Sequence, residues 1–392
     1  MNRLLACGCF KHIRQAVANT DIVVPPKDTV ERETENSSAT EELVFTNLPP
    51  QHQKNSLKRS FNILNELRSN NSTWKCDDTG NRLKFDHDGH LEEAFFDKCS
   101  ITVVPQTFHK LAFLKNVWLS NNAIESLPET FCLLPGLESL WLNNNKLITI
   151  ANIPPCVKAL YLSKNPLFSL NGIGCLTNLE KLGVDTCDLR EIPPEIGNLT
   201  RLTVLEAHSN GFKRLPAEIG KLSALKRLSI HTNAIRTLPN EIGNLASLTW
   251  LSLHYNRLQT LPESMGNLAS LQRLSIHHNE LSSIPSSFSN IKNVIVVSLF
   301  HNRLTTVPDE VLCAWKKCEK LALYDNDIRI IPAGIGHMTN LTDLWLYGNP
   351  WTVLPPEITK LPHLSSLWIT DDAHPIADYQ AIIKSNPKLK IN

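Results

Sequence analysis

LKRLSIHTNAIRTLPNEIGNLAS (residues 225–247) is followed directly by LTWLSLHYNRLQTLPESMGNLAS (residues 248–270), and the two stretches align without a gap. In both, an apolar residue at positions four and six alternates with polar neighbours, which is the period of a half-buried β-strand. Position nine is Asn, whose amide can satisfy backbone donors and acceptors where the chain leaves the strand. The later Leu-Pro pair predicts a return segment that is extended and then turns, because Pro fixes φ and lacks an N–H.

The same pattern recurs along most of the chain. Its spacing is 23 residues in nine of twelve steps, falling to 20 and 22 around Val157 and rising to 24 before Cys318. No single unit can bury its own apolar face, but stacked units share a continuous core. We therefore predict an α/β solenoid, a curved horseshoe with a parallel strand ladder on its concave face. The thirteen units begin at Leu91, Leu114, Leu137, Val157, Leu179, Leu202, Leu225, Leu248, Leu271, Val294, Cys318, Leu341 and Leu364.

Position nine of the unit shows how strictly the pattern is kept. Two units carry Cys99 or Cys187 there, and we interpret these as structural substitutes for Asn, because Cys is small and tolerates burial. The ten cysteines are mostly scattered among the repeats, which favours reduced thiols. The Asn members are Asn122, Asn145, Asn165, Asn210, Asn233, Asn256, Asn279, Asn302, Asn326 and Asn349.

The composition shifts divide the chain into four parts. Residues 1–54 are predicted to be a flexible tail and linker, because residues 25–54 are rich in Pro, Glu, Ser and Thr. Residues 55–90 are predicted to form an N-terminal cap, with helical apolar spacing at 57, 61, 64 and 67. Residues 91–374 hold the repeats, and residues 375–392 are predicted to form a C-terminal cap with a short amphipathic helix. Both ends need such protection, because an open ladder leaves unpaired backbone groups.

The overall composition excludes several functions. A net charge of +1 gives no basic footprint for nucleic acid. No apolar stretch is long enough for a transmembrane helix, and the N-terminus has no signal-peptide core, so we expect a cytoplasmic protein. The sequence contains no Gly-rich phosphate loop, no metal-spaced Cys/His set and no nucleophile elbow. We therefore expect a non-enzyme with no cofactor and no metal.

The 23-residue unit with Leu-Pro-x-Glu-Ile-Gly-x-Leu, as in residues 238–245, resembles the intracellular Ras-group class of leucine-rich repeats. That class includes the Shoc/Sur-type scaffolds, the scribble-type proteins and the plant intracellular Ras-group proteins. The resemblance covers about residues 91–374 and implies a signalling scaffold that binds a small GTPase, a phosphatase subunit or another adaptor. The units at Leu137 and Val157 depart from it, because Leu-Pro is missing after their Asn. We expect the protein to be a monomer.

A short stretch of the predicted cap, Arg82-Leu83-Lys84-Phe85, is only loosely similar to a phosphatase-docking motif, and we interpret it as a strand of the cap.

The partner surface should lie on the strand side chains that point away from the core, at unit positions three, five and seven. Trp, Tyr and Arg are the residue types that dominate interfaces, whereas a solenoid needs no aromatic residue at these positions to fold. Stacking of adjacent rings on one another is the alternative interpretation. A ligand-recognition protein of innate immunity or effector type would use the same face. The candidates are Trp118, Trp141, Tyr161, Arg227, Trp250, Arg273, His208, His231, His254, His277, Phe300, Tyr324, Trp345, Tyr347 and Trp368.

Four of these candidates form a histidine row at position seven: His208, His231, His254 and His277. Adjacent imidazoles about 5 Å apart could bridge a metal, but the four-histidine row itself contains no Cys or carboxylate to complete a tetrahedral ligand set. A pH-sensitive contact surface and a by-product of repeat duplication remain as alternatives.

Cys7 and Cys9 lie beside Leu4, Leu5 and Phe10, with basic residues nearby. Residue 2 is Asn, which excludes N-myristoylation. Two thioacyl chains would suffice to attach the tail to the inner membrane surface, and an unmodified tail is the alternative.

Overall fold

The computed structural model describes residues 51–72, 83–369 and 389–391. The chain divides into two units, Met1–Leu48 and Pro49–Asn392, and the described residues all belong to the second. The predicted lipidation sites Cys7 and Cys9 and the predicted helix within residues 375–392 lie outside the described residues. Among the residues that are described, no helix is both long and apolar enough to span a membrane.

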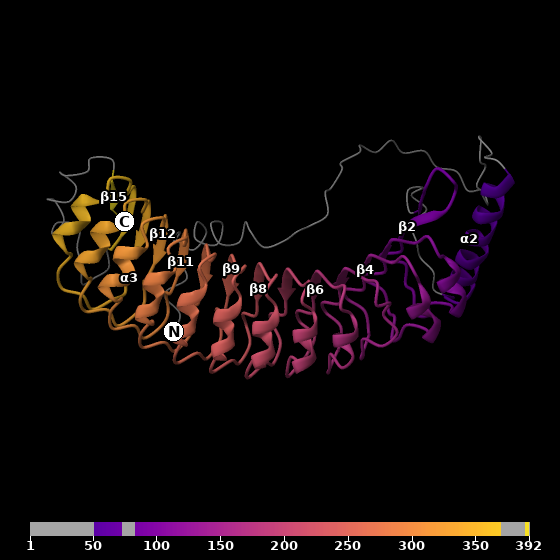
Figure 1. Cartoon of the computed structure of the whole chain (residues 1–392), viewed down its shortest axis with the longest axis horizontal. Helices are drawn as coiled ribbons and strands as arrows, with labels where there is room; N and C mark the ends of the chain where they lie inside the picture. Colours follow the sequence, from indigo (N-terminus) through magenta and orange to yellow (C-terminus); the bar gives the residue numbers. More distant parts are fainter. Residues whose placement is uncertain (1–50, 73–82, 370–388, 392) are drawn as a thin grey trace. The chain divides into compact units, whose positions relative to one another are not determined.

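The second unit is built on one open sheet of fifteen strands, paired in the order of the sequence. The first pair is antiparallel and every later pair is parallel. The strands line the concave side of an arc, as predicted (Figure 1). They are β1 (Leu83–Phe85), β2 (Leu91–Phe95), β3 (Asn116–Trp118), β4 (Ser139–Trp141), β5 (Ala159–Tyr161), β6 (Lys181–Gly183), β7 (Val204–Glu206), β8 (Arg227–Ser229), β9 (Trp250–Ser252), β10 (Arg273–Ser275), β11 (Val296–Ser298), β12 (Lys320–Ala322), β13 (Asp343–Trp345), β14 (Ser366–Trp368) and β15 (Lys390–Ile391).

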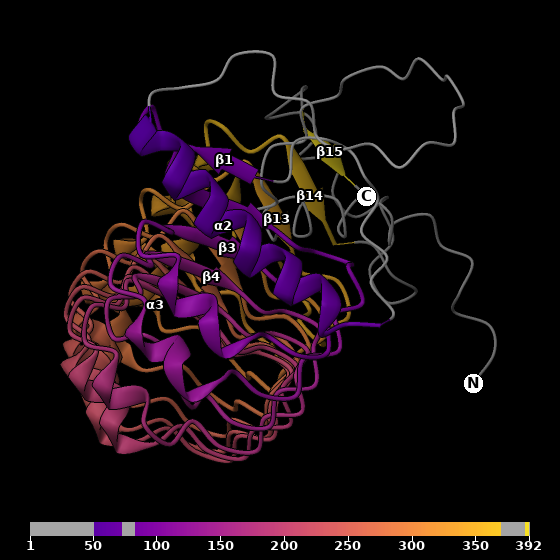
Figure 2. The same ribbon diagram turned by 90° about the vertical axis from the view of Figure 1, so that its right-hand side faces the viewer.

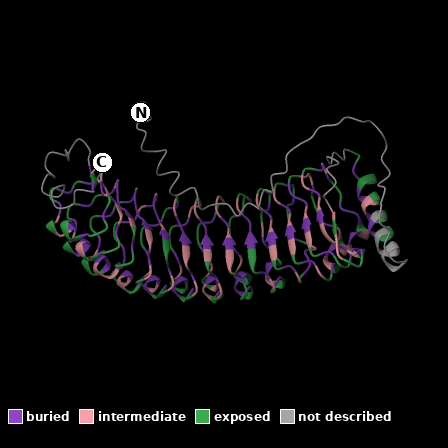
Figure 3. Ribbon diagram, turned by 90° about the horizontal axis from the view of Figure 1, so that it is seen from above, coloured by how far each residue is buried: buried purple, intermediate pink, exposed green. Residues whose placement is uncertain are grey.

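The strand register places equivalent residues of successive repeats side by side. Leu251 of β9 pairs with Leu228 of β8 and with Leu274 of β10, and all three side chains are buried. Leu253, at position six, is also fully buried. Seen from above the concave face, buried and partly exposed residues alternate along the strands (Figure 3). The alternation predicted from the sequence is therefore confirmed, and positions three, five and seven face outward.

The Asn at position nine forms the hydrogen bonds expected of it. In one representative repeat, Asn256 Oδ1 accepts the N–H of Ile235 at 3.0 Å, and Nδ2 donates to the carbonyl oxygens of Ile230 (3.1 Å) and Leu253 (2.9 Å). Each Asn thus ties its own turn to the preceding repeat. Cys187 takes the same place, with Sγ 3.2 Å from the Leu162 carbonyl oxygen.

The convex side consists of short 3-10 helices that begin after the Pro of most repeats (Figure 1). The 24-residue step before Cys318 provides one extra residue, and an α-helix, α3 (Asp309–Ala314), replaces the 3-10 helix there. No helix lies between β4 and β5, where the Leu-Pro pair is missing. The 3-10 helices are η1 (Gln106–Lys110), η2 (Glu129–Leu133), η3 (Ile173–Cys175), η4 (Pro194–Asn198), η5 (Ala217–Lys221), η6 (Asn240–Asn244), η7 (Glu263–Asn267), η8 (Ser286–Asn290), η9 (Ala333–His337) and η10 (Pro356–Lys360).

The N-terminal end of the ladder is covered by helix α2 (Gln51–Ser69) and by β1 (Figure 2). Ile63 and Leu67 of α2 are buried in the core shared with the repeats. Asn71 joins the end of α2 to the first repeat, since Nδ2 donates to the Leu67 and Val103 carbonyl oxygens at 2.6 and 2.9 Å. The helix begins at Gln51, four residues before the predicted start at residue 55. The prediction missed these four residues, QHQK, because they are polar and the start was predicted from the spacing of apolar residues.

Candidate functional site

The concave face carries an aromatic stack at position five of the first four repeats, formed by Phe95, Trp118, Trp141 and Tyr161. Ring centroids are separated by 4.1 Å from Phe95 to Trp118, 4.3 Å from Trp118 to Trp141 and 5.6 Å from Trp141 to Tyr161. The rings are within 13° of parallel. All four side chains are half-buried, so neighbouring rings cover the faces of the inner rings while the edges remain accessible.

A second, longer stack runs along position seven. Its rings lie 4.1 to 4.6 Å apart and within 15° of parallel. Three members, His277, Phe300 and Tyr324, are only 5 to 7% exposed. The stacking alternative considered from the sequence is therefore present in both rows, and these three rings have little surface to offer a partner. In order, the seven rings are His208, His231, His254, His277, Phe300, Tyr324 and Tyr347.

A shorter stack at position eight lies against the histidine row. Tyr255, His278 and His301 follow one another at centroid distances of 4.1 and 4.2 Å. Their rings meet the position-seven rings edge to face, as between His278 and His277 at 5.3 Å and 73°. This row was not predicted from the sequence, although its residues directly follow the position-seven residues.

Burial makes the central histidines poor bases. Burial and the nearby imidazoles of His278 and His208 lower the pKa of His254 to about 4. Burial together with the surrounding imidazoles lowers the pKa of His277 to about 2. Neither ring nitrogen of His277 has a hydrogen-bond partner within the described part of the chain. The imidazoles of His254 and His277 are therefore neutral at physiological pH.

Position three of the same repeats holds a cation–π arrangement. The Arg227 guanidinium lies 3.7 Å from the ring centroid of Trp250, and that of Arg273 lies 5.5 Å away. Arg227 also pairs with Glu206 on the preceding strand. Between this row and the histidines runs a column of serines at position five, Ser229, Ser252, Ser275 and Ser298.

The last two tryptophan candidates lie on neighbouring strands, where Trp345 pairs in register with Trp368. Trp368 Nε1 donates to Ser366 Oγ at 2.8 Å. Trp345 and Tyr347 pack against the cluster of Phe300, Ala322 and Tyr324. These two side chains therefore contribute to packing as well as to the face.

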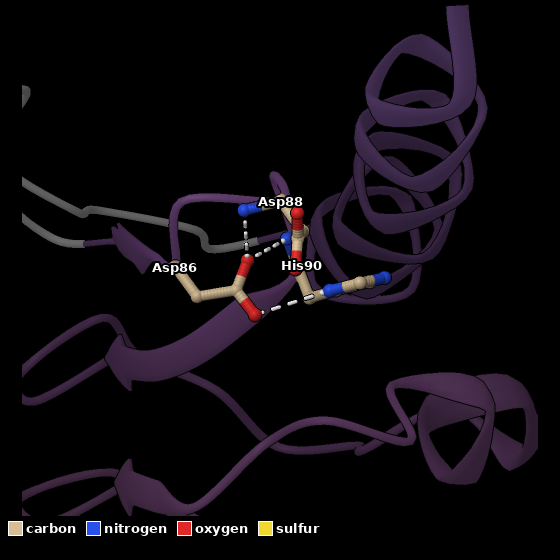
Figure 4. Close-up of side chains that lie close together, drawn as sticks. All are labelled: Asp86, Asp88 and His90. Carbon is tan, nitrogen blue, oxygen red and sulfur yellow. Dashed lines mark hydrogen bonds and ion pairs between the residues drawn. The ribbon is translucent and has the colours of Figure 1, made fainter. Parts of the chain in front are cut away.

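One group outside the concave face brings metal-ligand residue types together. Asp86, Asp88 and His90 lie in the turn between β1 and β2, with one potential ligand atom of each within 4.8 Å of the others (Figure 4). Asp86 Oδ1 accepts the N–H groups of Asp88 (2.9 Å) and His90 (2.8 Å), and Oδ2 lies 3.1 Å from His90 Nδ1. Burial alone would raise the pKa of Asp86, but these hydrogen bonds lower it overall. Both carboxylate oxygens are thus engaged in holding the turn. This DxDGH turn, residues 86–90, was not among the sites predicted from the sequence.

A cysteine and a histidine also meet on the convex side. Cys313 Sγ lies 3.5 Å from His337 Nδ1 and 3.7 Å from Asp309 Oδ2. Burial and the Asp309 carboxylate raise the pKa of the Cys313 thiol. The thiolate needed for nucleophilic chemistry is therefore disfavoured.

The cysteines correct one expectation from the sequence. Cys99 is disulfide-bonded, whereas the six other described cysteines are free thiols. Cys99 is therefore more than a substitute for Asn at position nine, and the prediction of reduced thiols is wrong at this residue.

Comparisons with known proteins agree with the fold. A model described as a leucine-rich repeat region matches residues 156–257, a two-copy leucine-rich repeat model matches residues 91–155, and a single-repeat model matches residues 247–268 and 270–291. Among curated proteins, none matches the chain in sequence.

Several solved structures share this architecture. A leucine-rich-repeat protein of Leptospira interrogans is 26% identical, with a TM-score of 0.67 over 84% of this chain and 98% of that one. The plant peptide hormone receptor RGFR1, solved in complex with RGF2, is 27% identical, with a TM-score of 0.63 over 72% of this chain and 48% of the receptor chain. An internalin of Listeria monocytogenes is 19% identical, with a TM-score of 0.65 over 76% and 85% of the two chains, and shows the fold alone.

Proposed function

Because the chain contains leucine-rich repeats, a fold that serves protein interaction, we propose that it is a non-catalytic binding protein that holds its partner on the concave face. The observation that carries the proposal is the position-five stack of Phe95, Trp118, Trp141 and Tyr161. Large rings at outward strand positions leave a continuous apolar strip half exposed, and such strips are typical of interaction sites.

The geometry of the stack defines what a partner would contact. The rings lie face to face along the ladder, so a ligand meets their edges rather than the faces of the inner rings. Ring edges carry the positive part of the aromatic quadrupole. We expect an extended or helical protein segment that lays apolar side chains and carbonyl oxygens along the strip. RGFR1, similar in fold and 27% identical, is a receptor solved with a bound peptide, which supports the same use here.

More specifically, we propose that the protein is a monomeric intracellular signalling scaffold. Its support is the resemblance of the Leu-Pro-x-Glu-Ile-Gly-x-Leu units to the Ras-group class, together with the six free thiols. The corresponding partners are a small GTPase, a phosphatase subunit or another adaptor. The four-part organisation, with a tail at 1–54 and caps at 55–90 and 375–392, belongs to the same proposal.

A second candidate is a ligand-recognition protein that works in an oxidising compartment. The disulfide at Cys99 favours it, since disulfides persist mainly in such compartments. Cell fractionation combined with thiol labelling separates the two settings. A protein in the cytosolic fraction with a reduced Cys99 supports the scaffold, and a protein in a membrane-enclosed or secreted fraction with an oxidised Cys99 supports the alternative.

The test of the binding face uses two variants that act differently. Ser139→Arg places a long cation beside Trp141 and leaves all four rings in place, whereas Trp118→Ala with Trp141→Ala removes the centre of the strip. Both are expected to abolish affinity capture of the partners that the unaltered chain retains from its native cell. Phe168→Ala is the matched control, because Phe168 is an aromatic residue that is 65% exposed and lies outside the strands. Unchanged capture by Ser139→Arg would refute this location.

A further inference from the structure

A strongly basic patch lies on the flank of the solenoid, in the segments that directly follow the concave strands. Positions 8–14 of three consecutive repeats comprise residues 209–215, 232–238 and 255–261. These segments contain Lys213, Arg214, Arg236 and Arg257, and not one Asp or Glu. We refer to these four side chains as the basic flank.

The backbone holds the members of the basic flank close together. The N–H of Arg236 donates to the carbonyl oxygen of Lys213 at 3.4 Å, and that of Arg257 donates to Ile235 at 2.9 Å. Adjacent repeats of such a ladder are about 4.8 Å apart, so the four positive charges, at positions 10 to 13 of their repeats, lie in a patch that extends about 10 Å along the ladder. All four side chains are exposed.

Several cations in other repeats are paired with a carboxylate of the neighbouring repeat. Lys115 pairs with Glu92, Lys158 with Glu138 and Lys146 with Glu125. No member of the basic flank is in an ion pair with any described residue.

The two adjoining repeats mark the limits of the patch. On one side, Arg190 lies next to Glu191, with Asp188 nearby in the same segment. On the other side, Glu280 occupies the position equivalent to Arg257, and its Oε2 accepts a hydrogen bond from Gln259 at 3.3 Å. These carboxylates mark the two edges of the basic flank.

Like charges on adjacent strands or turns repel one another, so the basic flank is unfavourable for the isolated chain. The repulsion is relieved when a carboxylate-bearing segment lies across it. Three of the four side chains are Arg, whose planar fork binds a carboxylate through two parallel hydrogen bonds. We propose that the basic flank binds a short acidic segment, rich in Asp and Glu, of a partner protein.

Single-stranded nucleic acid fits this surface less well. Such ligands stack their bases on a row of aromatic side chains beside the basic groove. The three segments of the flank include one aromatic residue at an exposed position, Tyr255, and one face of its ring is covered by His278. The chain's net charge of only +1 also gives little long-range attraction for a polyanion.

This site lies beside the concave face and does not depend on the position-five aromatic stack. Its test is therefore independent of the function proposed above. A chain that loses partner capture through Ser139→Arg is still expected to bind an acidic peptide at the flank.

The experiment measures fluorescence polarisation of a labelled octapeptide of alternating Asp and Glu, titrated with the full chain at physiological ionic strength. Arg214→Glu with Arg236→Glu is expected to weaken binding by at least about tenfold, through loss of two contacts and the added repulsion. The neutral pair Arg214→Gln with Arg236→Gln is expected to give an intermediate loss. Lys292→Glu with Lys316→Glu is the control of equal charge change, because both lysines are exposed on the convex side among acidic neighbours.

The outcomes that overturn the proposal are distinct. The proposal is wrong if the peptide shows no saturable binding, or if the Arg214/Arg236 variants bind it with unchanged affinity. An equal loss of affinity in the Lys292/Lys316 control would also overturn it, because that result would indicate only non-specific attraction. Two further probes test the other anions. An oligothymidylate of equal charge or vesicles containing phosphatidylserine, if bound more tightly than the peptide through the same arginines, would replace the acidic segment as ligand.

Discussion

At the scale of single residues, the buried imidazole of His277 is the most unusual feature of the concave face. Its ring is stacked between His254 and Phe300 and is only 5% exposed. Because a charge there would be poorly solvated, its pKa in the folded chain is lowered to about 2. An unfolded histidine titrates near 6.5. Below that pH the unfolded chain therefore binds a proton that the folded chain does not.

This difference predicts that acid destabilises the protein through His277. The contribution is negligible above about pH 7.5 and grows as the pH falls, reaching about 1.4 kcal/mol at about pH 5.5. His277→Phe keeps an aromatic ring in the stack and removes the proton. We expect the variant to lose less of its free energy of unfolding than the wild type between about pH 7 and pH 5.5, as measured by urea denaturation.

The control for this measurement is the same replacement at an exposed histidine, His363→Phe. A His277→Phe variant whose stability falls with pH as steeply as that of the wild type would show that His277 becomes protonated within the fold. Other histidines of the stack contribute in the same direction, since burial also lowers the pKa of His254 to about 4. The effect of one substitution is therefore a reduction of the pH dependence and not its removal.

At the scale of elements, the contact between successive 3-10 helices is closer than the sequence indicates. The Gly of the Glu-Ile-Gly motif does not serve a left-handed turn, because Gly243 does not have a positive φ. Its role is to allow close approach of η7 to η6, because a Cβ there would lie 2.1 Å from the Ser264 carbonyl oxygen. The repeat thus needs Gly for the packing of one convex helix on the next.

Gly243→Ala is therefore expected to be destabilising, by about 1 to 3 kcal/mol, since backbone must move to admit the methyl group. Gly136→Ala is the matched control. A Cβ at residue 136 would meet its nearest neighbour, the Ala112 carbonyl oxygen, at an ordinary 3.5 Å. Thermal or urea unfolding of the two variants measures the difference, and equal stabilities would contradict the packing role.

The elements also show what could be predicted from the sequence. The repeat register predicts the strands, the inward leucines and the Asn ladder, because each follows from a local pattern that recurs in the next unit. The disulfide at Cys99 and the ring stacks could not be established in this way. They depend on contacts between side chains of different units, and outward aromatic residues are equally compatible with stacking and with partner binding.

The outward orientation of the candidate side chains could be predicted from the sequence, but their exposure could not. Positions three, five and seven do face outward, but His277, Phe300 and Tyr324 are buried by their own neighbours in the stack. Rows of like residues raise one another's burial, which a position-by-position analysis does not take into account. The basic flank has a sequence signal, namely four cations without a carboxylate in three aligned segments. This signal becomes visible only when the segments are compared with the ion pairs of other repeats.

At the scale of the whole molecule, each strand within the described residues pairs only with its neighbours in the sequence, from β1 to β15. Stability in such a ladder is the sum of local terms and nearest-neighbour interfaces. The first interface is supported by α2, whose Leu67 is fully buried against the repeats. A destabilising substitution in α2 should therefore loosen the first repeats and leave the later repeats unchanged.

Leu67→Ala tests this property. Truncation of a buried leucine costs about 2 to 5 kcal/mol, here at the interface between α2 and the first repeats. We expect faster amide hydrogen exchange in β1 to β3 and unchanged exchange from β8 onward, because α2 covers the N-terminal end of the ladder (Figure 2) and the described strands pair in sequence order. Leu251→Ala, at an equally buried position in β9, is the comparison and should accelerate exchange in β8 to β10 on both of its sides. If Leu67→Ala instead accelerated exchange equally in all strands, the solenoid would unfold as one cooperative unit, and the basic flank and the aromatic strip would be linked through the stability of the whole.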